Sequence, residues 1–278
     1  MASRWEDLPK WQKDNEYIRS GYRMPSYSFY RSMRDLKHLH NETVNIWSHL
    51  LAAFLFSIHL VQFLVECDDL SMDVVVVLIF SLGVILYFIL SFIHHLFSNH
   101  SKKVMNRALR LGHLGAVIVI WCSAISFTYF GFYCDRQMRV RYMSVVTAAA
   151  LISMIFVFQP EFRHPNSRLA RTLTYFALGF TAFLPAIHLA HVDEQALYQR
   201  TMLASYRNLT ILNSLGGLLY LTRIPERFCR NTFDIYGSSH QIMHVMVVWG
   251  ALLYQAGLFT TRQRWRNDMV NGLVCTAA

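Results

Sequence analysis

The chain has few charged residues for its length. Only 15% of its 278 residues are Asp, Glu, Lys or Arg, whereas 54% are hydrophobic and the mean hydropathy is +0.27. Soluble domains carry about 25% charged residues. This shortage excludes an ordinary soluble domain and an intrinsically disordered chain. The composition indicates an integral membrane protein, and the length leaves room for roughly seven helices of about 20 residues each.

The sequence also lacks closely spaced cysteine pairs and a segment typical of a signal peptide. The five cysteines show no paired spacing, which argues against a zinc knuckle or a secreted disulfide framework. Cys67 and Cys134 are expected on the same side of the membrane and could pair, with sidedness as the only support. Residues 1–41 contain no apolar core of signal-peptide length, so we expect no cleaved signal before the first span.

Acidic residues are fewer than basic ones, and the net charge is +9. Such an excess would suit an anionic partner such as nucleic acid. In a membrane protein, however, basic residues gather in cytoplasmic loops and beside lipid headgroups. We therefore expect no nucleic-acid partner.

Apolar blocks predict an all-α integral membrane fold, a bundle of seven transmembrane helices. The predicted spans are residues 45–65, 74–97, 113–133, 142–160, 172–192, 207–222 and 237–260. The sixth is short and polar, but omitting it would leave an overlong loop. The expected organisation is a polar cytoplasmic N-terminal segment (1–44), a seven-helix domain (45–260) and a C-terminal tail (261–278).

Basic residues also predict the orientation. With the N-terminus inside, 18 of the 26 Lys and Arg residues face the cytoplasm, as the positive-inside rule requires. The N-terminus is therefore expected in the cytoplasm and the C-terminus outside, in the plasma membrane or the endoplasmic reticulum. This topology is opposite to that of a G-protein-coupled receptor, and the Asp-Arg-Tyr and Asn-Pro-x-x-Tyr motifs of that class are absent from the expected spans.

This orientation brings polar groups from four helices to one depth near the cytoplasmic leaflet. They are Glu42, Asn45 and His49 in the first helix, His94 and His95 in the second, His113 in the third, and His240 and His244 in the seventh. Ionisable groups in a membrane are costly and usually face the bundle interior with a partner. The sequence therefore predicts a functional site in this layer.

The spacing of the histidines suits a metal ion. His240 and His244 lie one turn apart on one helical face, the arrangement by which a helix supplies two nitrogen ligands. Two packed or hydrogen-bonded histidines are the alternative for this pair alone. With His95, three histidines from two helices would leave one open position on a tetrahedral Zn²⁺, as in catalytic zinc sites. Ser91, one turn before His95, would orient a ligand or a water, or bond back to its own helix.

Glu42, Asn45 and His49 share one face of the first helix. Glu42 would either join the polar layer or stabilise the positive end of the helix dipole, with Asn41 or Thr43 as the capping residue. A cap does not explain an inward-facing His49.

Three separated motifs carry a resemblance to a known family. They are Asn-Glu-Thr-Val-Asn-Ile-Trp-Ser-His at 41–49; Ser91-x-x-x-His95 with His100 beyond it; and Arg-Ile-Pro-Glu-Arg-Phe at 223–228, followed by Phe-Asp at 233–234 and Ser-His-Gln-Ile-Met-His at 239–244. In this order, over roughly residues 18–260, the chain resembles the progestin and adipoQ receptor family. It is most similar to the adiponectin-receptor branch, which includes fungal members, and more distantly to hemolysin III and the alkaline ceramidases.

The resemblance implies a zinc ion held by His95, His240 and His244 and a lipid-accessible cavity within seven helices. Adiponectin receptors are associated with hydrolysis of the ceramide amide, and fungal relatives with zinc and lipid homeostasis. The implied function is a zinc-dependent ceramidase-type amide hydrolase acting on membrane lipid, with room for an extracellular protein ligand. The alternative is a non-hydrolytic lipid-binding receptor or scaffold with a structural zinc.

One position departs from the family pattern. Where the family has Leu-Asp at the start of the third helix, this chain has Leu111-Gly112. Zinc held by three neutral imidazoles would still lower the pKa of a bound water toward about 7. The carboxylate that orients this water and passes on its proton is missing. His113 is the first candidate to replace it, as a base or a further ligand, and Glu42 is the second.

Overall fold

The computed structural model describes residues 3–67, 70–159, 162, 167–192 and 195–275. Within these ranges the regular structure is helical, apart from one isolated bridge between Ser3 and Tyr22. The short helix α1 spans Phe29–Arg34. The long helices are α2 (Thr43–Val65), α3 (Met72–Phe97), α4 (Lys102–Gly131), α5 (Arg136–Phe158), α6 (Arg168–Ala190), α7 (Leu197–Thr222) and α8 (Ser239–Val270).

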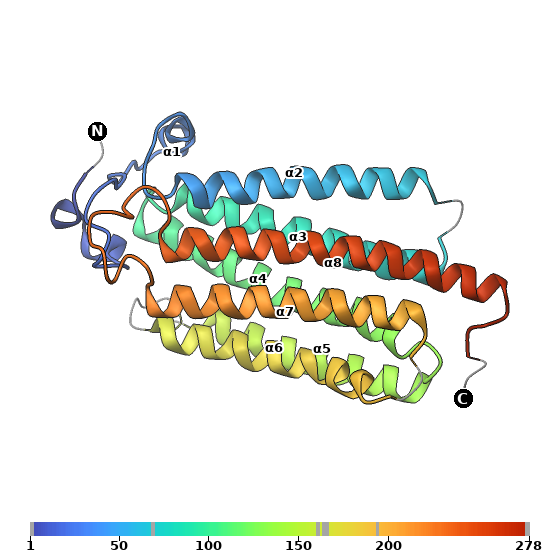
Figure 1. Ribbon diagram of the computed structural model, residues 1–278. Helices are drawn as coiled ribbons and strands as arrows, with labels where there is room; N and C mark the ends of the chain where they lie inside the picture. Colours follow the sequence, from blue (N-terminus) through green and yellow to red (C-terminus); the bar gives the residue numbers. More distant parts are fainter. Residues whose placement is uncertain (1–2, 68–69, 160–161, 163–166, 193–194, 276–278) are drawn as a thin grey trace.

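The long helices run side by side and alternate in direction (Figure 1). The N-terminal segment and the connector between α7 and α8 lie together at one end of the bundle, and the C-terminus lies at the other. The starts of α2, α4 and α8 and the end of α3 therefore lie at the end that carries the N-terminal segment. This arrangement confirms the seven-helix bundle expected from the apolar blocks.

Six of the long helices in the described part of the chain are long and apolar enough to cross a membrane: α2 to α6 and α8. Helix α7 has 26 residues but also contains Arg200, Arg207, Asn208 and Asn213, which explains its lower hydropathy. It nevertheless packs closely against α8. A Cβ added at Gly257 of α8 would lie 1.8 Å from Ser205 Oγ of α7, so this contact requires glycine.

Three helices extend ten or more residues beyond the predicted apolar blocks. Helix α4 begins at Lys102 rather than residue 113, α7 at Leu197 rather than 207, and α8 continues to Val270 rather than ending at 260. Hydropathy marks the part of a helix that suits lipid, whereas Lys, Arg and Gln are good helix formers outside it. The α8 extension is fixed by an ion pair between Arg262 and the buried Asp73 of α3, at 2.6 Å.

A disulfide joins Cys134, between α4 and α5, to Cys275, beyond α8, with the Cα atoms 5.3 Å apart. Cys67 is a free thiol. The suggested pairing of Cys67 with Cys134 is therefore wrong. The reason is the length of α8, which carries Cys275 to the end of the bundle where α4 ends.

Candidate metal centre

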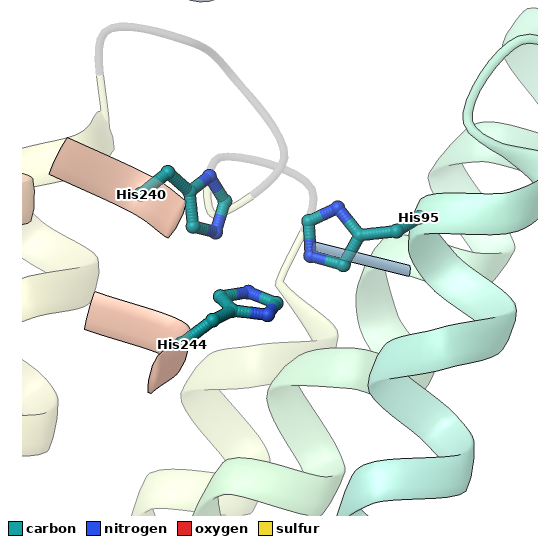
Figure 2. A group of neighbouring side chains, drawn as sticks. All are labelled: His95, His240 and His244. Carbon is teal, nitrogen blue, oxygen red and sulfur yellow. The ribbon is translucent and has the colours of Figure 1, made fainter. Parts of the chain in front are cut away.

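His95, His240 and His244 form the three-histidine cluster. One ligand nitrogen from each lies within 4.8 Å of the other two. Figure 2 shows the three rings pointing toward one another, His95 from one side and the two α8 residues from the other. The ring centroids are separated by 5.0 Å, 4.7 Å and 4.9 Å. The structure therefore brings the predicted ligands together, because α3 ends and α8 begins at the same level.

Glu42 fixes the orientation of His95. His95 Nδ1 donates a hydrogen bond of 2.7 Å to Glu42 Oε2, and Asn45 Nδ2 donates another of 2.7 Å to the same oxygen. His95 therefore presents Nε2 to the cluster, as carboxylate-bound metal-ligand histidines do. Although Glu42 stands at the N-cap of α2, its side chain accepts no capping hydrogen bond. Of the two interpretations of Glu42, the structure supports membership of the polar layer.

His49 packs directly against the cluster. Its ring stacks on that of His244 with centroids 3.8 Å apart and an interplanar angle of 20°. The side chain is fully buried, and neither ring nitrogen has a hydrogen-bond partner among the residues that the structure describes. His49 therefore limits the movement of His244 by packing.

A cavity of about 1050 Å³ lies beside the cluster. Its polar end is lined by Glu42, Ser91, His94, His95, His113, His240 and His244. Its apolar end is lined by residues of α6 and α7 that include Phe180, Phe183 and Leu209. Lys10 and Trp11 of the N-terminal segment also line it. The volume is at the upper end of the range for small-molecule sites, and the mixed lining suits an amphipathic ligand.

Ser91 and His113 also reach this cavity, whereas Asn45 and His49 are not in its lining. Ser91 lines it one turn from His95. His113 lines it from α4, and its Nδ1 is 2.7 Å from the Tyr175 hydroxyl of α6. His113 is not a member of the three-histidine cluster.

Arg23 is a site residue that sequence reasoning missed. Its guanidinium donates to the backbone carbonyls of His95 (2.6 Å) and Leu96 (3.0 Å). These carbonyls belong to the last turn of α3, whose acceptors lack partners within the helix. Arg23 therefore holds the turn that carries His95. A single arginine in a polar tail forms no pattern that would reveal this role.

Glu226 holds the first turn of α8. Its Oε2 accepts from the Ser239 backbone N–H at 2.7 Å, and its Oε1 accepts from Asn15 Nδ2 at 3.0 Å. Ser239 directly precedes His240, so the buried carboxylate fixes this end of the cluster to the N-terminal segment. The Arg-Ile-Pro-Glu-Arg-Phe motif is the sequence signal for this residue.

An ion pair lies near the cavity at this end of the bundle. Asp14, which lines the cavity, is 2.5 Å from Arg168 Nη2. The Asp14 side chain is half exposed. Its partial loss of water raises its pKa, but the guanidinium groups of Arg168 and Arg171 outweigh this effect and hold the pKa below its ordinary value. Asp14 is therefore a fixed negative charge at neutral pH.

Known proteins resemble this chain along most of its length. The family model described as haemolysin-III related matches residues 37–255. The adiponectin receptor protein of Drosophila melanogaster is 32% identical over 91% of this chain and 58% of its own length. The ADIPOR-like receptor IZH2 of Saccharomyces cerevisiae is 29% identical over 97% of this chain and 87% of its own length. Heptahelical transmembrane protein 3 of Arabidopsis thaliana is 28% identical over 90% of this chain and 84% of its own length. The chain thus spans under three fifths of the fly relative.

Proposed function

The chain belongs to the haemolysin-III-related family as an adiponectin-receptor-like multi-pass membrane protein, and we propose that it binds one zinc ion through His95, His240 and His244. The donor set supports this proposal, because imidazole nitrogen is a preferred zinc ligand and three such ligands leave one position open. Glu42 already orients His95 as a zinc ligand would be oriented. In addition, His244 Nδ1 is buried without a hydrogen-bond partner in the described part of the chain.

The proposed activity is hydrolysis of the amide bond of a ceramide-type membrane lipid. The observation that carries this proposal is the position of the three-histidine cluster at the polar end of a cavity of about 1050 Å³ whose other end is apolar. An acyl chain fits the apolar end, and its amide then lies beside the histidines. When bound, zinc would polarise the amide carbonyl and lower the pKa of a water molecule.

The residues around the cluster have separate roles in this proposal. Phe180, Phe183 and Leu209 bind the acyl chain and exclude water from the apolar end. The Ser91 hydroxyl, on the cavity wall, hydrogen-bonds the lipid headgroup. Glu42 keeps His95 in one tautomer.

A non-hydrolytic receptor or scaffold, with structural zinc and a bound lipid, is the second candidate. The observation that favours it is Gly112, which leaves α4 without a carboxylate at the cavity. Glu42 is engaged by both His95 and Asn45, and such a carboxylate is poorly placed to exchange protons. In this case an extracellular protein would be the signal to which the receptor responds.

The proposal also includes the orientation of the chain in the membrane and the identity of that membrane. We place the N-terminus in the cytoplasm because 18 of 26 basic residues then face it. The Cys134–Cys275 disulfide supports the same orientation, since it lies at the opposite end of the bundle and disulfides form on the oxidising side of a membrane. The plasma membrane and the endoplasmic reticulum both provide these two sides.

One experiment tests the zinc site and the activity together. Purified wild type and His240→Ala are analysed for metal content and incubated with labelled ceramide, with and without a strong chelator. His100→Ala, which changes a histidine outside the cavity lining, is the control. We expect near one equivalent of zinc and chelator-sensitive release of fatty acid in wild type and control, and loss of both in His240→Ala. Equal metal in all three proteins would contradict the site, and zinc without hydrolysis would favour the receptor.

A further inference from the structure

His94 is a further polar side chain beside the three-histidine cluster. It lines the same cavity, and its ring centroid lies 4.8 Å from that of His95. Its Nδ1 is buried and has no hydrogen-bond partner among the described residues. A buried nitrogen of this kind destabilises the protein unless a ligand or a water pairs with it. The position of His94 therefore implies a polar partner within the cavity.

Gly112 of α4 leaves the space that the ring of His94 needs. A Cβ added at Gly112 would lie 3.4 Å from His94 Cβ and 3.6 Å from Cγ. An alanine is therefore tolerated there, but a longer side chain would extend along the imidazole. The imidazole of His94 therefore occupies space that a larger side chain at residue 112 would fill.

The backbone of His94 is held in place from outside the bundle. Arg23 donates to the carbonyls of His95 and Leu96, which are the next two residues of α3. A side chain on a fixed turn loses little freedom when it binds a ligand, so the geometry is already prepared.

The neighbouring Glu42 and the Nδ1 atom of His113 already have hydrogen-bond partners, whereas His113 Nε2 is buried without one among the described residues. Glu42 Oε2 accepts one hydrogen bond from His95 and another from Asn45. His113 pairs with Tyr175, and its ring contacts are with Tyr175 and Phe162. The ring of His94, in contrast, contacts a member of the cluster.

We propose that His94 hydrogen-bonds the oxygen atom of the ligand that occupies the cavity beside the three-histidine cluster, either a water molecule or the carbonyl oxygen of a lipid amide. The proposal rests on the zinc site proposed above. It assigns to His94 a role in binding the ligand and none in holding the metal.

The test uses the full chain in detergent, loaded with Co²⁺ and titrated with acetohydroxamic acid at one pH. The visible absorption of cobalt reports metal occupancy and probe affinity separately, without reference to turnover. We expect His94→Phe, and Gly112→Leu, which covers the ring without changing α3, to keep one equivalent of cobalt and to bind the probe about 10- to 100-fold more weakly. His94→Gln and Gly112→Ala are the matched controls and should stay close to wild type.

The outcomes separate this proposal from the zinc site. Wild-type affinity in both His94→Phe and Gly112→Leu would overturn the role of His94 while leaving the zinc site intact. Loss of cobalt in His94→Phe and His94→Gln would also overturn it, because His94 would then hold the metal. If the wild-type protein binds no cobalt, the zinc site is contradicted, and so is this proposal. If His94→Phe does not fold, Gly112→Leu decides.

Discussion

At the scale of single residues, the cluster depends on a carboxylate that does not belong to it. Glu42 accepts the Nδ1 hydrogen of His95, and a charged acceptor raises the basicity of a ligand histidine. We expect Glu42→Gln to lower zinc affinity about 10- to 100-fold, the usual cost of changing such a group. Competition with a chromophoric chelator measures the affinity. Glu66→Gln, at the far end of α2, is the control, and equal affinity in both variants would contradict the role of Glu42.

Residue 112 offers a second test at this scale. The neighbouring His94 leaves room for a Cβ at 3.4 Å, so Gly112→Asp would place a carboxylate at the cavity wall. A positioned acid or base contributes about 10²- to 10⁴-fold in rate, and we expect ceramide hydrolysis to rise within that range at matched zinc content. Gly112→Asn, which has the same shape without the charge, should give no gain. A wild type that is already fast, and that His113→Ala disables, would instead assign the base to His113.

At the same scale, part of the site could be predicted and part could not. The spacing of His240 and His244 and the depth of His95 follow from helix direction along the sequence, and the family resemblance joins them into one ligand set. The contact between Glu42 and His95 depends on which helices are lateral neighbours, and hydropathy carries no information about that. Arg23 was missed for the same reason, because its partners are backbone carbonyls of a distant helix.

At the scale of helices, the extension of α8 is tied to the start of α3 by a buried ion pair. Asp73 is 3% exposed and Arg262 Nε lies 2.6 Å from its Oδ2. Removing one partner leaves a buried charge, which costs about 3–5 kcal/mol. We expect Arg262→Met to lower the melting temperature in detergent by about 5–15 °C.

Two further variants define this effect. Asp73→Leu combined with Arg262→Met removes both charges and should recover most of the loss, because an apolar pair of similar volume replaces the ion pair. Arg136→Met, an exposed position at the start of α5, removes the same charge without breaking this pair. A melting temperature that falls equally in Arg136→Met and Arg262→Met would show that net charge, and not the buried pair, is responsible.

Helix ends were the least predictable part of the fold. Apolar blocks gave the number and order of the long helices, because a membrane span needs an uninterrupted apolar stretch. The first turns of α4 and the last turns of α8 are basic and polar, and in these regions capping and tertiary contacts decide where a helix begins or ends. Ser101, for example, accepts from the Val104 backbone N–H at the start of α4.

At the scale of the whole molecule, the proposed orientation assigns each end of the bundle to a compartment. After mild reduction, an impermeant thiol reagent on intact cells should label Cys67 or Cys134, which belong to the outer end in this orientation. A cysteine introduced at Lys103, near the start of α4, should react only after the membrane is permeabilised. The reverse pattern would invert the topology and contradict the positive-inside argument.

The disulfide between Cys134 and Cys275 closes a covalent ring, with a sequence separation of 141 residues, that contains α5 to α8. A protease that cuts the chain once anywhere inside this ring therefore releases no fragment. His95 lies before the ring and His240 and His244 lie within it, so both halves of the histidine cluster stay on one covalent molecule after such a nick. Cleaved protein will migrate as intact chain on a non-reducing gel, and only reduction will reveal the break.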